Sequence, residues 1–196
     1  PDFNPNNRSD MTPEHFRNRS VTDVFEPGST VKPFTISMAL ASGRFSVETP
    51  VSTSPGIHYV GRHPVRDIHD YGDLTLGGVL IKSSNVGTAK VAMELAPEEL
   101  YGILDKVGFG QATGIELPGE VGGSLLKRER WRPIEHATLS FGYGLSSTQV
   151  QLARAYAVLA SGGMLRPVTL KRRSGVVPGK RVLSDQTTRQ INALLE

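Results

Sequence analysis

The chain has 196 residues, enough to bury the core of one ordinary domain, and its 38% hydrophobic and 21% charged residues are typical of a globular protein rather than a disordered one. A net charge of +3 is too small to indicate a nucleic-acid partner, and the lack of cysteine excludes disulfides and thiolate zinc sites. No apolar run approaches the roughly 18 residues that a membrane-spanning helix needs.

The first half of the chain is expected to alternate polar loops with helices. Residues 1–24 are polar and rich in turn formers, which predicts an ordered loop or a short helix. Apolar residues at three- and four-residue intervals over 30–42 predict a helix that stops at Gly43. The prolines and glycines of 50–72 predict a loose hairpin. Two short helices are expected next, one before and one after the sequence SSN.

The next helix is predicted from Pro97 to Val107, because proline suits a first helical turn and the apolar residues repeat at helical spacing. Gly108 closes this helix, and the glycine-rich run 108–124 is expected to be irregular.

Two more helices are predicted toward the end of the chain. One is capped by Ser146 or Ser147 and is followed by a pair of glycines. The other is capped by Ser184 or Asp185 and stops within its apolar stripe. A domain rarely stops there, so we expect a truncated one.

Ser29 and Lys32 stand three residues apart at the start of the first long helix. Residues i and i+3 share a helix face, which places the Lys32 amine beside the Ser29 hydroxyl. Pro33 is tolerated because first-turn amides are unpaired, and those amides can face an oxyanion that forms near Ser29. A lysine can serve as the base for a serine when burial lowers its pKa. The pair alone also fits a simple helix cap.

A second polar motif, Ser83-Ser84-Asn85, lies at the junction of two expected helices. Ser83 and Asn85 flank one residue, so both side chains can face one cleft. A polar turn between helices is the alternative interpretation. S-x-x-K together with S-x-N is the pattern of penicillin-binding proteins and serine β-lactamases.

The chain resembles the transpeptidase domain of class B penicillin-binding proteins, most closely the septal, cell-division enzyme of Gram-negative bacteria. The resemblance lies in “RNRSVTDVFEPGSTVKPF”, “KSSNVGTAKVA” and “ATLSFGYGLSSTQVQLARAYAVLASGG”. It implies an α/β (α+β) fold of the penicillin-binding-protein and serine β-lactamase type. The chain would cover mainly the helix-rich part and lack most of the central antiparallel sheet.

The resemblance also implies roles for four residues. Ser29 matches the nucleophile that attacks the D-Ala-D-Ala carbonyl and becomes an acyl-enzyme, and Lys32 matches the base that takes its proton. Ser83 matches the hydroxyl that relays a proton toward the leaving D-alanine. Asn85 matches the amide that binds the acyl side of the substrate and holds Lys32. The acyl group then passes to an amine of a neighbouring stem peptide, and β-lactams acylate the same serine.

The third motif of the family, K-[T/S]-G, has no match in this chain. Arg173-Ser174-Gly175 is the nearest sequence, but it follows the preceding helix too soon and lies in a turn. We therefore expect residues 1–196 to be a partial transpeptidase domain, truncated at both ends and weakly active or inactive by itself.

Two other functions remain open. A serine β-lactamase needs a deacylating water, often activated by a glutamate, and no E-x-x-x-N stretch follows the S-x-N motif at a suitable distance. A non-catalytic β-lactam sensor or divisome scaffold would share the nucleophile without cross-linking.

Asp67 and Asp70 are interpreted as part of a solvated face. Tyr143 lies between two glycines and could approach the site closely, but packing is an equally good interpretation. No cofactor or metal is expected, since the histidines lack H-x-x-x-H spacing.

The resemblance implies a location and partners as well. The complete protein would be a single-span inner-membrane protein with this domain in the periplasm. Its ligands would be peptidoglycan stem peptides and β-lactam antibiotics, and its neighbours a septal glycosyltransferase and divisome proteins.

Overall fold

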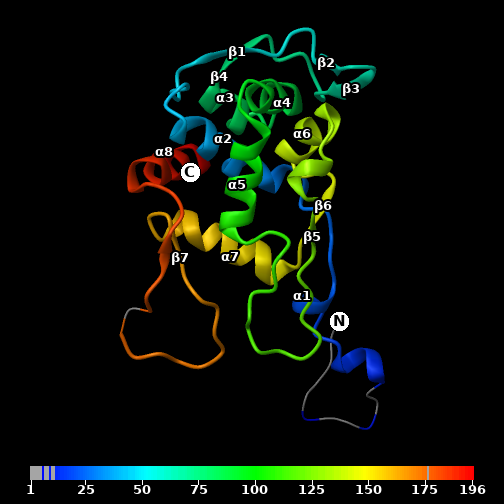
Figure 1. Ribbon diagram of the computed structural model, residues 1–196, viewed down its shortest axis with the longest axis vertical. Helices are drawn as coiled ribbons and strands as arrows, with labels where there is room; N and C mark the ends of the chain where they lie inside the picture. Colours follow the sequence, from blue (N-terminus) through cyan, green and yellow to red (C-terminus); the bar gives the residue numbers. More distant parts are fainter. Residues whose placement is uncertain (1–5, 7–8, 10–11, 176) are drawn as a thin grey trace.

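Helices dominate the structure, a computed structural model that describes residues 6, 9, 12–175 and 177–196. The strands among these residues form four separate antiparallel sheets of two strands each (Figure 1). The expected helix-rich α/β class is therefore confirmed. The turn-rich start predicted over 1–24 lies partly outside the described residues, and its described part holds the 3-10 turn η1 (Pro13–Phe16) and the short helix α1 (Arg19–Thr22).

Helix α2 (Lys32–Ala41) forms the centre of the fold, as its apolar spacing predicts. It continues from a 3-10 turn, η2 (Gly28–Val31), and every residue from 32 to 39 is buried. Other helices pack against it (Figure 1), among them α3 (Leu76–Ile81), α4 (Asn85–Met93), α5 (Pro97–Val107) and α8 (Asp185–Leu195).

Aromatic packing fixes the inner face of α2. The Phe34 ring is fully buried and meets Phe109 and Tyr156 edge to face, with ring centroids 5.9 Å and 5.6 Å apart. Edge-to-face pairs at such distances stabilise a core beyond the area that they bury. The first turn of α2 is thereby held against the loop after α5 and against α7 (Gln149–Ala160).

The segment 50–72 folds as the predicted hairpin, with a second strand pair at its base. Strands β2 (Ile57–Val60) and β3 (His63–Arg66) form the hairpin, which lies at the top of Figure 1. Strands β1 (Pro50–Ser52) and β4 (Asp73–Thr75) pair antiparallel where the excursion leaves and rejoins the helices.

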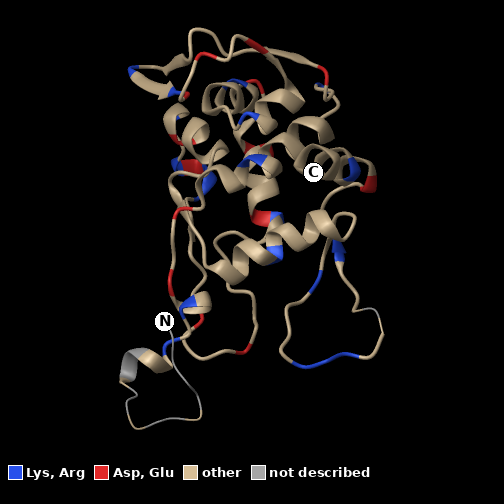
Figure 2. Cartoon of the chain, turned by 180° about the vertical axis from the view of Figure 1, so that it is seen from behind, with Lys and Arg blue, Asp and Glu red and all other residues tan. Residues whose placement is uncertain are grey.

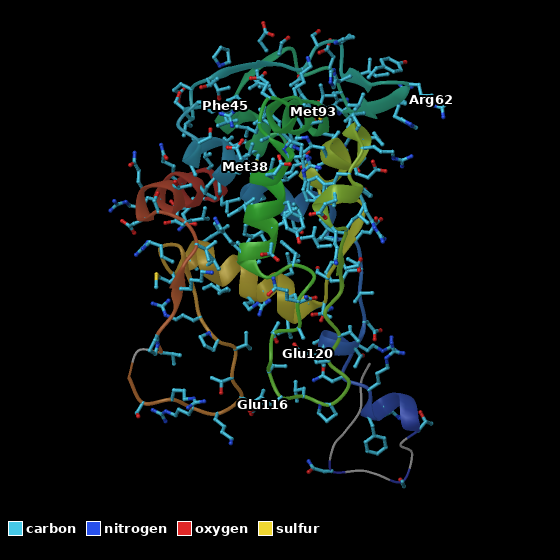
Figure 3. The ribbon with its side chains drawn as sticks, viewed as in Figure 1. Met38, Phe45, Arg62, Met93, Glu116 and Glu120 are labelled. Carbon is cyan, nitrogen blue, oxygen red and sulfur yellow. The ribbon has the colours of Figure 1, made fainter. Side chains whose placement is uncertain are left out.

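The irregular run after α5 is organised by one carboxylate. Gly108 ends α5 in the left-handed conformation, as predicted. Further along, Glu120 accepts hydrogen bonds from the main-chain nitrogens of Thr113 and Gly114, at 2.6 Å and 3.0 Å. Figure 3 shows Glu120 within this loop and Glu116 nearer its tip.

Several short elements of the second half were not anticipated from the sequence. They are β5 (Ser124–Leu125), η3 (Arg128–Arg130), α6 (Pro133–Ser140), β6 (Leu145–Ser146), β7 (Met164–Leu165) and β8 (Lys180–Arg181). Helix α6 carries the local signals of a helix start, a proline in its first turn and Glu135 reaching back to the cap, but it is only eight residues long.

The N-cap of α7 is Thr148, not Ser146 or Ser147 as predicted. The Thr148 hydroxyl accepts from the Gln151 nitrogen at 3.2 Å, and the Gln151 side chain accepts from the Thr148 nitrogen at 2.8 Å. This reciprocal pair satisfies two amides, which a serine one residue earlier cannot do. The prediction of Ser184 as the cap of α8 is confirmed, because its hydroxyl accepts from the Thr187 nitrogen at 3.0 Å.

A basic loop joins β7 to β8 and projects from the helical body (Figure 2). Its Lys171, Arg172 and Arg173 side chains are exposed. Within the described ranges, no helix is both long enough and apolar enough to span a bilayer.

Replacing Phe34 with alanine should destabilise the protein by about 3–5 kcal/mol, because the side chain is fully buried and two rings would lose their partner. Chemical denaturation followed by circular dichroism measures this change. Phe16→Ala is the matched control, since that ring is 70% exposed and its loss should change stability by less than about 0.5 kcal/mol. Equal destabilisation by the two variants would contradict the packing described.

Candidate active site

Ser29 lies in the 3-10 turn that leads into α2, and its side chain is exposed. Its carbonyl accepts the main-chain N–H of Lys32, so the two residues are locked one turn apart. In a 3-10 turn, side chains at i and i+3 eclipse one another. Within the described part of the chain, neither the Ser29 hydroxyl nor its N–H makes a hydrogen bond. Both groups are thus available to a ligand, the hydroxyl to attack and the N–H to bind an oxyanion.

Lys32 is almost entirely buried, with 1% of its surface exposed. Its Nζ donates to the Ser83 hydroxyl at 2.9 Å and also to the Ser83 carbonyl oxygen. Burial lowers the pKa of the Lys32 ammonium from 10.5 to about 8, and the charge of Asp67 acts in the opposite direction. Burial disfavours the charged form because the surrounding protein solvates an ammonium less well than water does.

The Lys32 contact depends on an unusual main-chain conformation at Ser83. This residue joins α3 to α4 with φ of 54°, in the left-handed region that non-glycine residues rarely adopt. Such a conformation costs about 1–3 kcal/mol and persists only where neighbouring contacts enforce it. Here it turns both the carbonyl and the hydroxyl of Ser83 toward Lys32.

Asn85 is the first residue of α4, and its side chain lies on the hairpin side of the motif. Its Nδ2 donates to the Arg66 carbonyl at 3.1 Å, at the end of β3. Among the described residues, the hydrogen bonds that hold Lys32 come from Ser83 rather than from Asn85.

Asp67 was interpreted from the sequence as part of a solvated face, but the structure places it on the S-x-N motif. One carboxylate oxygen accepts from the Asn85 and Val86 nitrogens at 2.5 Å and 3.0 Å, and the other accepts from the Ser84 hydroxyl at 2.5 Å. A carboxylate suits the N-terminus of a helix, where amides are unpaired and the dipole is positive. Asp67 therefore joins the hairpin to the site.

The structure thus brings Lys32 and Ser83 into direct contact and places Ser29 one turn before Lys32. Asn85 follows Ser83 at the start of α4, where its main-chain nitrogen donates to Asp67. A neutral lysine amine has two hydrogens and one lone pair. With both hydrogens directed to Ser83, the lone pair is free to accept a proton from an adjacent hydroxyl. An exposed serine hydroxyl and a buried lysine amine are the two groups that a serine nucleophile with a lysine base requires.

Residues 1–196 match the family described as “Penicillin binding protein transpeptidase domain”. The chain is 42% identical over 196 residues to “Probable peptidoglycan D,D-transpeptidase PbpC” of Pseudomonas aeruginosa, covering all of this chain and 35% of that protein. It is also 42% identical over 196 residues to “Peptidoglycan D,D-transpeptidase FtsI” of Escherichia coli K12, again covering all of this chain and 33% of that protein.

Two solved structures share the fold. One is described as a peptidoglycan glycosyltransferase from Burkholderia ambifaria (TM-score 0.89, 43% identity, 92% of this chain and 58% of that chain covered). The other is the TP domain of Burkholderia pseudomallei penicillin-binding protein 3 (TM-score 0.88, 45% identity, 92% of this chain and 55% of that chain covered).

The chain therefore belongs to the penicillin-binding protein transpeptidase family. It spans about a third of the length of the curated relatives that it matches.

Asp67→Ala should destabilise the start of α4 by about 1–2 kcal/mol, because the amides of Asn85 and Val86 lose their acceptor. Hydrogen–deuterium exchange should show faster exchange over residues 84–87. Asp70→Ala is the control, since Asp70 lies on the same loop but bonds to Ser54 and Gly72 instead. Unchanged protection at 84–87 in Asp67→Ala would contradict the assignment.

Proposed function

We propose that this chain carries the acylation site of a peptidoglycan D,D-transpeptidase that acts at the division septum and is a target of β-lactams. The observation that carries the proposal is the buried Lys32 amine bonded to Ser83, one turn from the exposed Ser29 hydroxyl. The family match and the names of the relatives support the substrate class.

In the proposed reaction, Ser29 Oγ attacks the carbonyl carbon of the penultimate D-alanine of a stem peptide. Lys32 accepts the hydroxyl proton, and the Ser29 N–H contributes to binding the oxyanion. The peptide C–N bond then breaks, and a proton passes from Lys32 through the Ser83 hydroxyl to the nitrogen of the leaving D-alanine. The product is an ester between Ser29 and the donor peptide.

In the second half-reaction, an amine of a neighbouring stem peptide attacks this ester. Its proton returns to the Ser29 oxygen by way of Lys32, and a new amide bond cross-links the two peptides. Asn85 is the first residue of α4, two positions after Ser83, and its side-chain amide is assigned to binding the acyl side of the donor. A β-lactam mimics the D-Ala-D-Ala bond, so it acylates Ser29 in the same way.

Two alternatives use the same serine and differ in the fate of the acyl-enzyme. A β-lactamase would release the hydrolysed drug rapidly, whereas a sensor or divisome scaffold would form a lasting adduct without cross-linking. The names of the relatives favour transpeptidation over both.

The same relationship supports a location. We place this domain in the periplasm, as part of a protein with a single inner-membrane span that works with a septal glycosyltransferase and divisome proteins. The basis is the similarity to an FtsI protein over the whole chain.

Ser29→Ala should abolish the covalent adduct that the intact protein forms with benzylpenicillin, because Ser29 is the proposed nucleophile, whereas the Ser83 hydroxyl, which also lies next to Lys32, is the proposed proton relay. Intact-mass spectrometry measures the adduct directly. Ser46→Ala is the matched control, because this exposed serine lies in the turn after α2, and it should label fully. An adduct of wild-type yield on the Ser29→Ala protein would refute the assignment of the nucleophile.

The acylation rate should rise with pH up to a midpoint near the Lys32 pKa of about 8. The pKa is lowered by burial, so the neutral, basic form of Lys32 gains population as pH increases through that value. Below the midpoint the rate should increase about tenfold per pH unit. Stopped-flow acylation by a chromogenic β-lactam measures the profile. A rate that is constant from about pH 6.5 to about pH 9 would contradict the role of Lys32 as the base.

A further inference from the structure

The chain that leads to Ser29 is paired with the segment that follows α6. Phe25 and Ser147 exchange two main-chain hydrogen bonds of 3.0 Å, and the Gly28 nitrogen donates to the Gly142 carbonyl at 3.0 Å. Figure 1 shows the chain after α1 rising beside β6. The nucleophile therefore directly follows a residue that is bonded to this second segment.

The two main chains approach so closely that a side chain is excluded between them. A Cβ built on Gly142 would lie 1.9 Å from the Gly28 carbonyl oxygen, and Gly142 has φ of +87°. Any other residue at 142 would have to move away from the serine turn. Residues 142–144, which we name the glycine arch, are therefore in direct main-chain contact with the turn that carries Ser29.

One side chain fastens the far end of the glycine arch. The Glu26 carboxylate accepts the main-chain N–H of Gly144 at 2.9 Å. The middle residue, Tyr143, donates its N–H to the Thr138 carbonyl of α6 at 3.0 Å. The arch is thus bonded to the helix behind it through Tyr143 and to the serine turn through Glu26.

The serine turn is also held at Thr30. The Tyr156 hydroxyl of α7 donates to the Thr30 carbonyl at 3.0 Å. Gly28 is bonded to the arch and Thr30 is bonded to Tyr156, so the residues before and after Ser29 each have a partner.

We infer that Glu26 is a positioning residue for Ser29: by binding the Gly144 amide it holds the glycine arch against the serine turn and fixes the direction in which the hydroxyl attacks. This inference rests on the proposed function. Glu26 does not touch the reacting atoms in this account. Displacement of a nucleophile by about 1 Å is enough to slow a reaction about a hundredfold, so the loss of a single anchor has a measurable effect.

The test is the acylation of the intact protein by a chromogenic β-lactam in wild type, Glu26→Ala and Glu26→Gln. In Glu26→Ala the limiting acylation rate constant should fall about tenfold, while the dissociation constant of the non-covalent complex stays within about twofold. Glu26→Gln should acylate within about twofold of wild type, because an amide oxygen accepts the same hydrogen bond. A loss of folded protein would lower the labelled fraction without changing the rate constant.

Glu48→Ala is the matched control, an exposed glutamate in the turn after α2, and it should acylate at the wild-type rate. A wild-type rate constant in Glu26→Ala would overturn the inference, and so would a Glu26→Gln protein as slow as Glu26→Ala. Hydrogen exchange over residues 142–147 gives a second readout that does not depend on activity, with faster exchange expected in Glu26→Ala only. An adduct on the Ser29→Ala protein would refute the proposed function. Unchanged hydrogen exchange over residues 142–147 in Glu26→Ala would refute only the role of Glu26 in holding the glycine arch.

Discussion

The arrangement of this site depends on one buried contact, the Lys32 amine against Ser83. Burial of an amine is unfavourable for its charged form, and the compensating hydrogen bonds come from a residue held in a left-handed conformation. Both unfavourable terms, the buried amine and the left-handed main chain of Ser83, therefore occur at the same contact. That combination lowers the pKa of Lys32 to about 8, so that more of the amine is neutral near that pH, and it directs hydrogens of the amine to Ser83.

Three segments that are distant in the sequence hold the residues around this contact. The hairpin leads into Asp67, which accepts from the first two amides of α4 and carries the negative charge that acts on Lys32. The segment after α6 supplies the glycine arch, which contacts the serine turn at Gly28. Helix α2 itself is fixed by Phe34 in the aromatic cluster. Each segment therefore positions a different part of the site: the hairpin side holds the start of α4, and the arch holds the turn before α2.

The sequence predicted the parts of the fold that have local causes. Apolar spacing located α2, and Pro97 and Gly108 marked the ends of α5, because these signals act within a few residues. The cap of α7 was missed although the T-x-x-Q spacing of Thr148 and Gln151 was a readable signal. The roles of Asp67 and Glu26 were not predictable in this way, since their partners lie 18 and 118 residues away along the chain.

The most direct test of this account is the ionisation of Lys32 itself. A titration of the intact protein with 15N-labelled lysine, followed at the Nζ atoms by NMR and assigned with Lys32→Arg, would report it. One amine signal should titrate near pH 8 and be absent from the spectrum of the variant. A Lys32 amine that titrates near 10.5, as a lysine in water does, would show that it is not poised as the base.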